Sequence, residues 1–245
     1  MSGYFCYELR FFINYIIFLH FRDAFNSGYV FLCKFFKMKA TRFLLLMLLS
    51  VFYSCKSDND TVFIGTDEWM TENLSVKKFN NGDPIPEAKT EAEWLKAGQD
   101  KSPAWCYQNN DPANGKSYGI LYNYYAVSDE RGLIPVGFHL ATDVEWSNLV
   151  NAAGGAEVAA ARLKDPEYWG GKDNGASLGF NARPGGVRIF DGGFSNMDRA
   201  VYFWSATEES VLTHFYFRMQ SDNDKVDRNY GFINYGMYLR CVKNK

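Results

Sequence analysis

The chain has 245 residues, a length that suits one large domain or two small ones. Hydrophobic residues make up 47% of the chain and charged residues 22%, as in ordinary globular proteins. Six of the 26 basic and two of the 28 acidic residues precede Cys55, so the part from Cys55 onward carries 20 basic against 26 acidic residues, a net charge of −6. This charge, and the lack of a basic cluster in the sequence, exclude nucleic acid as an expected partner.

The first 54 residues predict export. Residues 38–54, MKATRFLLLMLLSVFYS, have the anatomy of a secretory signal peptide, with a basic start, an apolar core and a small residue at the end. Because signal peptides stand at the start of a protein, we expect translation to begin at Met38 and residues 1–37 to be a mispredicted N-terminal extension. The alternative is a long hydrophobic leader or an additional membrane segment. The longest apolar run before Met38 has 11 residues, whereas a membrane-spanning helix needs about 20.

A cysteine follows the predicted signal peptide directly. The residues FYSC resemble the lipobox of bacterial lipoproteins, which implies that Cys55 carries lipid and starts the mature chain. The alternative is an ordinary signal peptide followed by an incidental cysteine. Residues 55–60 are polar and acidic, predict a flexible tether, and resemble the signal that sends lipoproteins of Bacteroidetes-type bacteria to the cell surface. We therefore expect a surface-exposed outer-membrane lipoprotein that its lipid holds to the membrane.

The next segments alternate strand, helix and loop patterns. Residues 61–74 predict two strands joined by a turn. Residues 90–98 predict a short helix, because Thr90 and Glu93 have the spacing of a capping box and Gly98 stands where a helix often ends.

Two further segments follow that helix. Residues 109–119, NNDPANGKSYG, are rich in turn formers and predict a loop. Residues 119–127, GILYNYYAV, are aromatic and predict a buried segment.

The stretch GFHLATDVEW places a histidine and two acids close together, which raises the question of a metal or acid–base site. Thr142 and Glu145 have the capping-box spacing, and Asp143 suits the first turn of a helix. His139 lies before this cap, so we expect it not to share a face with the acids. Trp146 opens the apolar stripe of the helix. We interpret the stretch as a helix start and predict no metal site.

The remaining chain predicts a second helical segment and several strands. Residues 156–164 form the helical segment, and residues 165–200 predict long loops with short strands between them. Residues 203–207 predict a strand end, residues 212–220 an alternating strand, and residues 231–243 a closing strand.

The segments together resemble a known family. IGTDEWMTENL, NNGDPIP, AWCYQNN, YGILYNYYAV, GFHLATDVEW, GFNARPGG, YFWSATE and YLRCVK occur in the order of the Fibrobacter succinogenes major paralogous domain, over residues 61–243. The GFHLATDVEW segment also resembles the LPTEAEW segment of formylglycine-generating enzymes, and both groups resemble the C-type lectin fold. The resemblance implies an α+β domain over residues 61–245. This C-type-lectin-like domain would have two short helices, a small antiparallel sheet, adjacent ends and long loops on one side.

Two cysteines remain in the mature domain, Cys106 and Cys241. In an oxidising compartment they form either one disulfide or two buried thiols, and their separation does not suit a zinc site. The family usually has a cysteine where Ile134 stands, and that cysteine would pair with Cys241. The sequence therefore leaves the pairing of Cys106 with Cys241 open.

The long loops predict a binding module. Aromatic, amide and charged side chains suit sugars or peptides, and the alternative is that these residues serve turn geometry alone. The EPN, QPD and WND motifs of calcium-dependent lectins are absent, and SDND at 221–224 lacks the spacing of a calcium loop, so no cofactor is expected and calcium is unsupported. The candidate ligand-binding residues are Trp169, Arg183, Arg188, Asn196, Asp198 and Arg199.

Catalysis is not expected. The mature chain lacks the close cysteine pair of formylglycine-generating enzymes and has no G-x-S-x-G motif, although a catalytic carboxylate pair stays open. We expect Trp146 and Trp204 to pack in the core. The expected function is a non-catalytic surface module for a glycan or protein ligand. The alternatives are a structural or appendage subunit of the envelope and, less favoured, an oxidase related to formylglycine-generating enzymes.

Overall fold

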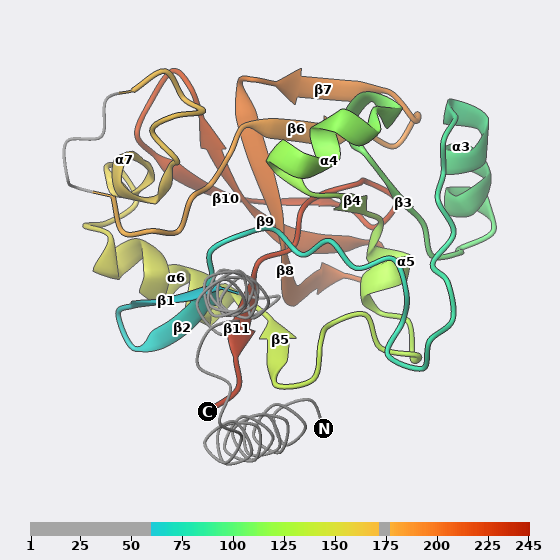
Figure 1. Cartoon of the computed structure of the whole chain (residues 1–245), viewed down its shortest axis with the longest axis horizontal. Coiled ribbons are helices and arrows are strands. Elements are labelled where there is room, and N and C mark those ends of the chain that lie inside the picture. Colours follow the sequence, from blue (N-terminus) through green and yellow to red (C-terminus); the bar gives the residue numbers. More distant parts are fainter. Residues whose placement is uncertain (1–59, 172–176) are drawn as a thin grey trace, which may run out of the picture. The chain divides into compact units, whose positions relative to one another are not determined.

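The computed structural model describes residues 60–171 and 177–245, and every structural statement below concerns this part of the chain (Figure 1). The predicted extension, the signal peptide, Cys55 and all of the tether except Asp60 lie outside the described residues.

A four-stranded antiparallel sheet joins the two ends of the domain. β1 (Thr61–Ile64) and β2 (Asp67–Met70) form the hairpin that the sequence predicts, with Gly65 at a φ of 66° in the turn. β11 (Cys241–Lys243) lies between β2 and β5 (Phe138–Leu140). This order brings the first and last strands of the domain together, as we expected.

A larger, mixed sheet forms the other part of the fold. Its strand order is β10-β9-β8-β6-β7, and β6 runs parallel to β8 while the other pairs are antiparallel. The small antiparallel sheet that we expected is present as β1-β2-β11-β5, whereas this larger sheet with its parallel pair was not predicted. The strands are β6 (Gly185–Arg188), β7 (Phe194–Met197), β8 (Ala200–Ser210), β9 (Thr213–Gln220) and β10 (Val226–Phe232). A two-stranded ribbon is formed by β3 (Trp105–Cys106) and β4 (Leu121–Tyr122).

The described residues contain five α-helices rather than the two that were predicted. They are α3 (Glu91–Gln99), α4 (Pro112–Tyr118), α5 (Tyr124–Val127), α6 (Asp143–Ala152) and α7 (Ala159–Leu163), with a 3₁₀ turn, η1 (Gln108–Asn110). α4 lies where the sequence predicted a loop, because Asp111 caps its first turn by accepting from the Ala113 amide, and proline suits the first helical position. Gly98 lies inside α3 and does not end it, since Asp100 is the C-terminal cap.

The predicted closing strand at 231–243 is two strands with an irregular segment between them. β10 ends at Phe232 and β11 begins at Cys241. Between them the chain forms single bridges to three other elements, through Gly236, Met237 and Tyr238. The segment therefore changes partners and cannot continue as one strand.

Aromatic side chains fill the core. Trp146 is fully buried and stacks on Phe217 with ring centroids 4.9 Å apart, and Trp69 lies 5.1 Å from Trp146 on the same side of the core. Trp204 is also fully buried, and its indole nitrogen donates to the Tyr122 carbonyl. Each such side chain contributes about 1.5–3 kcal/mol by burial. The predicted core roles of Trp146 and Trp204 agree with these positions.

Candidate functional site

A polar pocket lies at one end of the five-stranded sheet. It has a volume of about 370 Å³ and is lined by Asn196, Arg199, Ala200, Gln220, Ser221 and Asp222. These residues come from the end of β7, the start of β8 and the connection between them, and from the end of β9 and the turn after it, which lie together at the top of Figure 1. The Ser221 amide donates to the Arg199 carbonyl at 2.8 Å and fixes the two segments to each other. The pocket brings together two of the predicted ligand residues, Asn196 and Arg199.

Turn geometry explains why the chain takes this path. Asn196 and Asp198 have φ values of 60° and 61°, a left-handed conformation that asparagine and aspartate tolerate better than most residues. The Arg199 amide donates to the Asn196 carbonyl and closes the turn. Asp198 is not a lining residue. Its carboxylate accepts from the Tyr118 hydroxyl at 3.0 Å, and burial together with this carboxylate raises the pKa of Tyr118 to about 12.

Hydrogen bonds hold the two pocket amides in place. Asn196 Nδ2 donates to the Tyr202 hydroxyl at 2.7 Å, and Gln220 Nε2 donates to Asp227 at 3.2 Å. Within the described part of the chain, neither amide oxygen accepts a hydrogen bond, so both are available to a ligand donor. The amides are therefore oriented before any ligand arrives.

Arg199 and Asp222 give the pocket charge of both signs. The Arg199 side chain is exposed and makes no hydrogen bond or ion pair with any other residue that the structure describes. Asp222 accepts from the neighbouring Asn223 amide at 2.7 Å and keeps its second oxygen for a ligand. A guanidinium has fixed, forked donors, so the pocket combines donors and acceptors around a volume that fits a small polar molecule.

Arg188 is a correction, because it lies in the core and not in a binding loop. Its side chain has no exposed surface and donates to the carbonyls of Ala88, Thr90 and Gly192 at 2.8–3.0 Å. The guanidinium also lies 4.7 Å from the ring centroid of Trp94. These contacts enclose the guanidinium, so no ligand reaches it.

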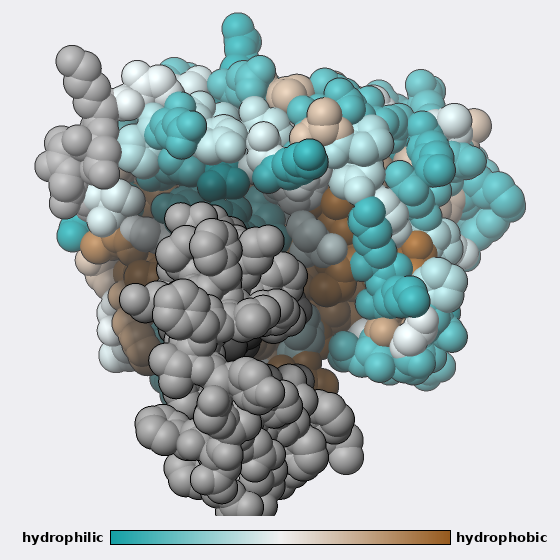
Figure 2. Space-filling model, in the orientation of Figure 1, coloured by the Kyte–Doolittle hydropathy of each residue, from teal (hydrophilic) through white to brown (hydrophobic). Residues whose placement is uncertain are grey.

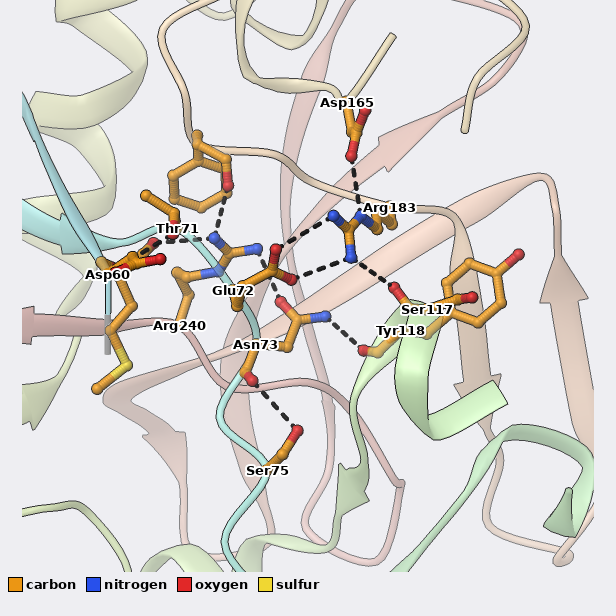
Figure 3. Close-up of polar contacts among 12 residues, drawn as sticks. Asp60, Thr71, Glu72, Asn73, Ser75, Ser117, Tyr118, Asp165, Arg183 and Arg240 are labelled. Atoms are coloured by element: carbon orange, nitrogen blue, oxygen red, sulfur yellow. Dashed lines mark hydrogen bonds and ion pairs between the residues drawn. The ribbon is translucent and has the colours of Figure 1, made fainter. Parts of the chain in front are cut away.

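Arg183 holds a loop to the body of the domain. Figure 3 shows its guanidinium between Asp165 and Glu72, with oxygens 2.8 and 3.0 Å away, while the Ser117 carbonyl accepts a third bond. The exposed fraction of its side chain is 17%. These bonds tie the segment after α7 to the segment after β2, which makes Arg183 a structural residue.

Trp169 packs against the same loop. Its indole nitrogen donates to the Ala182 carbonyl at 2.7 Å, and the Lys164 ammonium lies 4.8 Å from the ring centroid. The ring is half-buried against the core, so little of its face is open to a sugar.

Arg240 is a buried residue for which the sequence analysis predicted no role. Its guanidinium donates to the carbonyls of Met70 and Phe180 and to Asn73 Oδ1 (Figure 3). Burial lowers its pKa to about 9. The segment YLRCVK contains it, but an arginine in a predicted strand carries no signal of burial, because arginine is usually exposed.

Both predicted capping boxes are present. Thr90 accepts from the Glu93 amide at the start of α3, and Glu93 accepts in return from the Thr90 amide. Thr142 and Glu145 do the same at the start of α6.

His139 was expected not to share a face with the two acids, and for Glu145 this prediction was wrong. Its Nε2 lies 2.6 Å from Glu145 Oε1, and its Nδ1 lies 2.7 Å from Asn244 Oδ1. The capping carboxylate therefore serves the helix and the histidine together. Asp143 turns instead to Arg228. Among residues 60–171 and 177–245, no group of three or more histidine, cysteine or acidic side chains is placed to hold a metal ion.

The two cysteines are free and buried in the structure. Burial raises the pKa of the Cys106 thiol to about 11 and that of the Cys241 thiol to about 12. Such thiols are poor nucleophiles, because the thiolate is the reactive form. Of the two alternatives that the sequence left open, the structure therefore has two buried thiols.

Comparison with known proteins shows the family of the chain. Residues 62–243 match the model of the Fibrobacter succinogenes major domain. No curated protein and no solved structure matches the chain. Because the match covers most of the chain and nearly all of the described domain, the protein belongs to the Fibrobacter succinogenes major domain family.

Proposed function

We propose that this protein is a surface-exposed lipoprotein of the bacterial outer membrane whose domain binds a glycan without catalysing a reaction. In this proposal the domain is C-type-lectin-like, and the ligand occupies the polar pocket at the β7–β8 connection. The ligand is uncharged or mixed in charge, because Arg199 and Asp222 both line the pocket.

The observation that carries the proposal is the set of side chains in the pocket. Two oriented amides, a serine, an aspartate and an arginine face one volume of about 370 Å³. Hydroxyl groups of a sugar both donate and accept hydrogen bonds, and amide and carboxylate side chains match that pattern. The mixture suits a glycan better than a purely anionic or apolar ligand. The two thiols favour binding over cysteine-based catalysis, because burial raises the pKa of each.

A glycan array tests the proposal. Soluble residues 56–245 would be applied with calcium and with a chelator, as wild type and as Arg199→Ala. We expect saturable binding to one glycan class and its loss in Arg199→Ala, because a charged hydrogen-bond donor disappears. Lys78→Ala is the matched control, since Lys78 is exposed and lies outside the pocket. A blank array from folded protein, or equal binding by Arg199→Ala, contradicts the proposal and favours a protein ligand or a subunit role.

The lipid anchor has a separate test. Among the described residues, no helix combines the length and the apolar surface that a bilayer crossing requires. We propose that acyl chains on Cys55 hold the protein to the membrane. Cys55→Ser should release the protein from the membrane fraction and lower its mass by the acyl groups. Unchanged mass and unchanged membrane association would show that Cys55 carries no lipid.

A further inference from the structure

A second candidate site lies at the other end of the β8–β9 hairpin, away from the polar pocket. Three turns meet there. Four apolar side chains on them are exposed, and Tyr235 is partly buried. Phe190 is 52% exposed and Phe232 is 51% exposed. The eight residues of β9 run from this end to the pocket, and at the rise of a β-strand they span roughly 25 Å. We call this surface the apolar end, and it consists of Phe190, Val211, Leu212, Phe232 and Tyr235.

Ring contacts and a backbone hydrogen bond connect the residues of the apolar end. Tyr235 lies between two phenylalanines, with ring centroids 6.1 Å from Phe190 and 6.0 Å from Phe232. The Ile233 amide donates to the Leu212 carbonyl at 3.0 Å, which places the β8–β9 turn against the same residues. Isolated exposed apolar residues are ordinary, whereas a contiguous group marks an interaction surface.

Backbone hydrogen bonds hold the turns that carry these rings. The Tyr235 amide donates to the Phe232 carbonyl at 2.8 Å, and the Trp94 indole donates to the Asn234 carbonyl at 3.0 Å. In the β6–β7 turn, the Gly192 amide donates to Ile189 and the Gly193 amide donates to Asp191 Oδ1. Rigid turns lower the entropy cost of binding, so this surface is preformed.

Three carboxylates lie beside the apolar end. Asp191 lies close enough to raise the pKa of Tyr235, together with the larger effect of burial. Glu91 of α3 packs against Gly192, and Figure 1 shows the β6–β7 turn beside α3. Glu209 accepts from Thr213, which pairs with Phe232. Carboxylates of three different elements therefore lie next to the apolar side chains.

Apolar side chains next to carboxylates indicate which class of partner the apolar end can bind. A second copy of the chain would bring the same carboxylates against these, which is unfavourable. A sugar would use the rings but would gain nothing from exposed Val211 and Leu212. We propose that the apolar end binds a polypeptide segment that carries aromatic or aliphatic side chains next to lysine or arginine. Aromatic anchors in the middle would provide most of the affinity, and the acids around them would steer the basic segment.

Peptide selection tests this proposal. The full chain in lipid nanodiscs would be screened against a phage library of random peptides, with empty nanodiscs for counter-selection. We expect enriched peptides in which basic residues alternate with apolar ones. Phe232→Ala should weaken the best peptide by about tenfold or more, as expected for a central aromatic anchor. Phe63→Ala is the matched control, because Phe63 is 71% exposed on β1.

A separate variant tests the contribution of the negative charge. Asp191→Asn keeps an acceptor for the Gly193 amide and removes the negative charge. It should weaken binding several-fold at low salt and less at high salt, because salt screens surface charges.

Several results would overturn the proposal. They are the enrichment of no peptide, acidic rather than basic peptides, or affinity that Phe232→Ala leaves unchanged. A dimer that Phe232→Ala dissociates would assign this surface to a second copy. Glycan binding that Phe232→Ala abolishes, while Arg199→Ala does not, would assign it to a sugar. The last result would also contradict the proposed function, because it removes the glycan from the polar pocket. The other results leave the proposed function untouched, because their variants lie at the opposite end from the pocket.

Discussion

Arg188 and Arg199 lie close in sequence, but their side chains have opposite surroundings. Arg188 is fully buried and satisfies three carbonyl groups, whereas Arg199 is exposed at the pocket. Arg188→Met should lower the free energy of unfolding by about 3–5 kcal/mol, because the carbonyls lose their donors in the core. Arg199→Met should change it by less than about 0.5 kcal/mol. Urea unfolding measures both values, and equal effects would contradict the assigned roles.

His139 is a residue whose charge state follows from its neighbours. Burial disfavours the imidazolium, but the two acceptors, Asn244 and Glu145, outweigh burial and raise the pKa of His139 above 6.5. For Glu145, burial is likewise outweighed, mainly by hydrogen bonds from Thr142 and His139, so its pKa is lowered from 4.5. The stabilisation from His139 is complete below pH 6.5 and is lost as the pH rises through its folded pKa. The stabilisation from Glu145 is complete above pH 4.5 and is lost as the pH falls through the pKa of Glu145 in the folded protein.

Nuclear magnetic resonance tests the prediction for His139. We expect its ring protons to titrate above pH 6.5 and those of His214 to titrate below it, because burial lowers the pKa of His214. Raising the pH from 6 to 8 should cost at most about 1 kcal/mol of stability, since the His139 side chain is 38% exposed and solvent screens the pair. His139→Gln should remove this pH dependence. A His139 pKa below that of His214 would refute the arrangement.

At the level of elements, local signals decided which predictions succeeded. The capping boxes of α3 and α6 were predicted because a cap needs only residues three positions apart. The β1–β2 hairpin was predicted because its two strands and its turn are adjacent in the sequence. The division of the closing segment into two strands was not predicted. It depends on bridges from Gly236, Met237 and Tyr238 to three elements that are distant in the sequence.

The same distinction applies to the candidate site. The sequence predicted Asn196 and Arg199 as loop residues. It did not predict that Gln220, Ser221 and Asp222 share one pocket with them, because only the strand pairing between β8 and β9 brings the two turns together. Burial of Arg188 was equally hidden, since its carbonyl partners lie about a hundred residues away or in a neighbouring turn.

The cap of α6 gives a prediction at this scale. Thr142→Ala should cost about 0.5–2 kcal/mol, because the Glu145 amide loses its acceptor. Thr142→Ser keeps a hydroxyl and should retain most of the stability. Thermal unfolding of the two variants and the wild type measures the difference. Equal loss in both variants would assign the effect to packing of the threonine methyl group instead of to capping.

At the scale of the whole domain, the part of the chain that the structure describes is stabilised by packing and has no disulfide. Cys106 and Cys241 are free and belong to two different core clusters. In residues 56–245, thiol reagents should therefore label neither cysteine in the native state at pH 8 and both after denaturation without reductant. If denaturation without reductant exposes no thiol, the two cysteines form a disulfide and the structure is wrong at this point.

The central claim for the whole molecule is that the polar pocket, and not the apolar end, holds the glycan. Calorimetric titration of the glycan selected on the array, with wild type, Arg199→Ala and Phe232→Ala, tests this claim most directly. We predict that Arg199→Ala raises the dissociation constant by about tenfold or more, while Phe232→Ala leaves it unchanged. An unchanged dissociation constant in Arg199→Ala, with loss of binding in Phe232→Ala, would contradict the claim and move the glycan to the other end of the sheet.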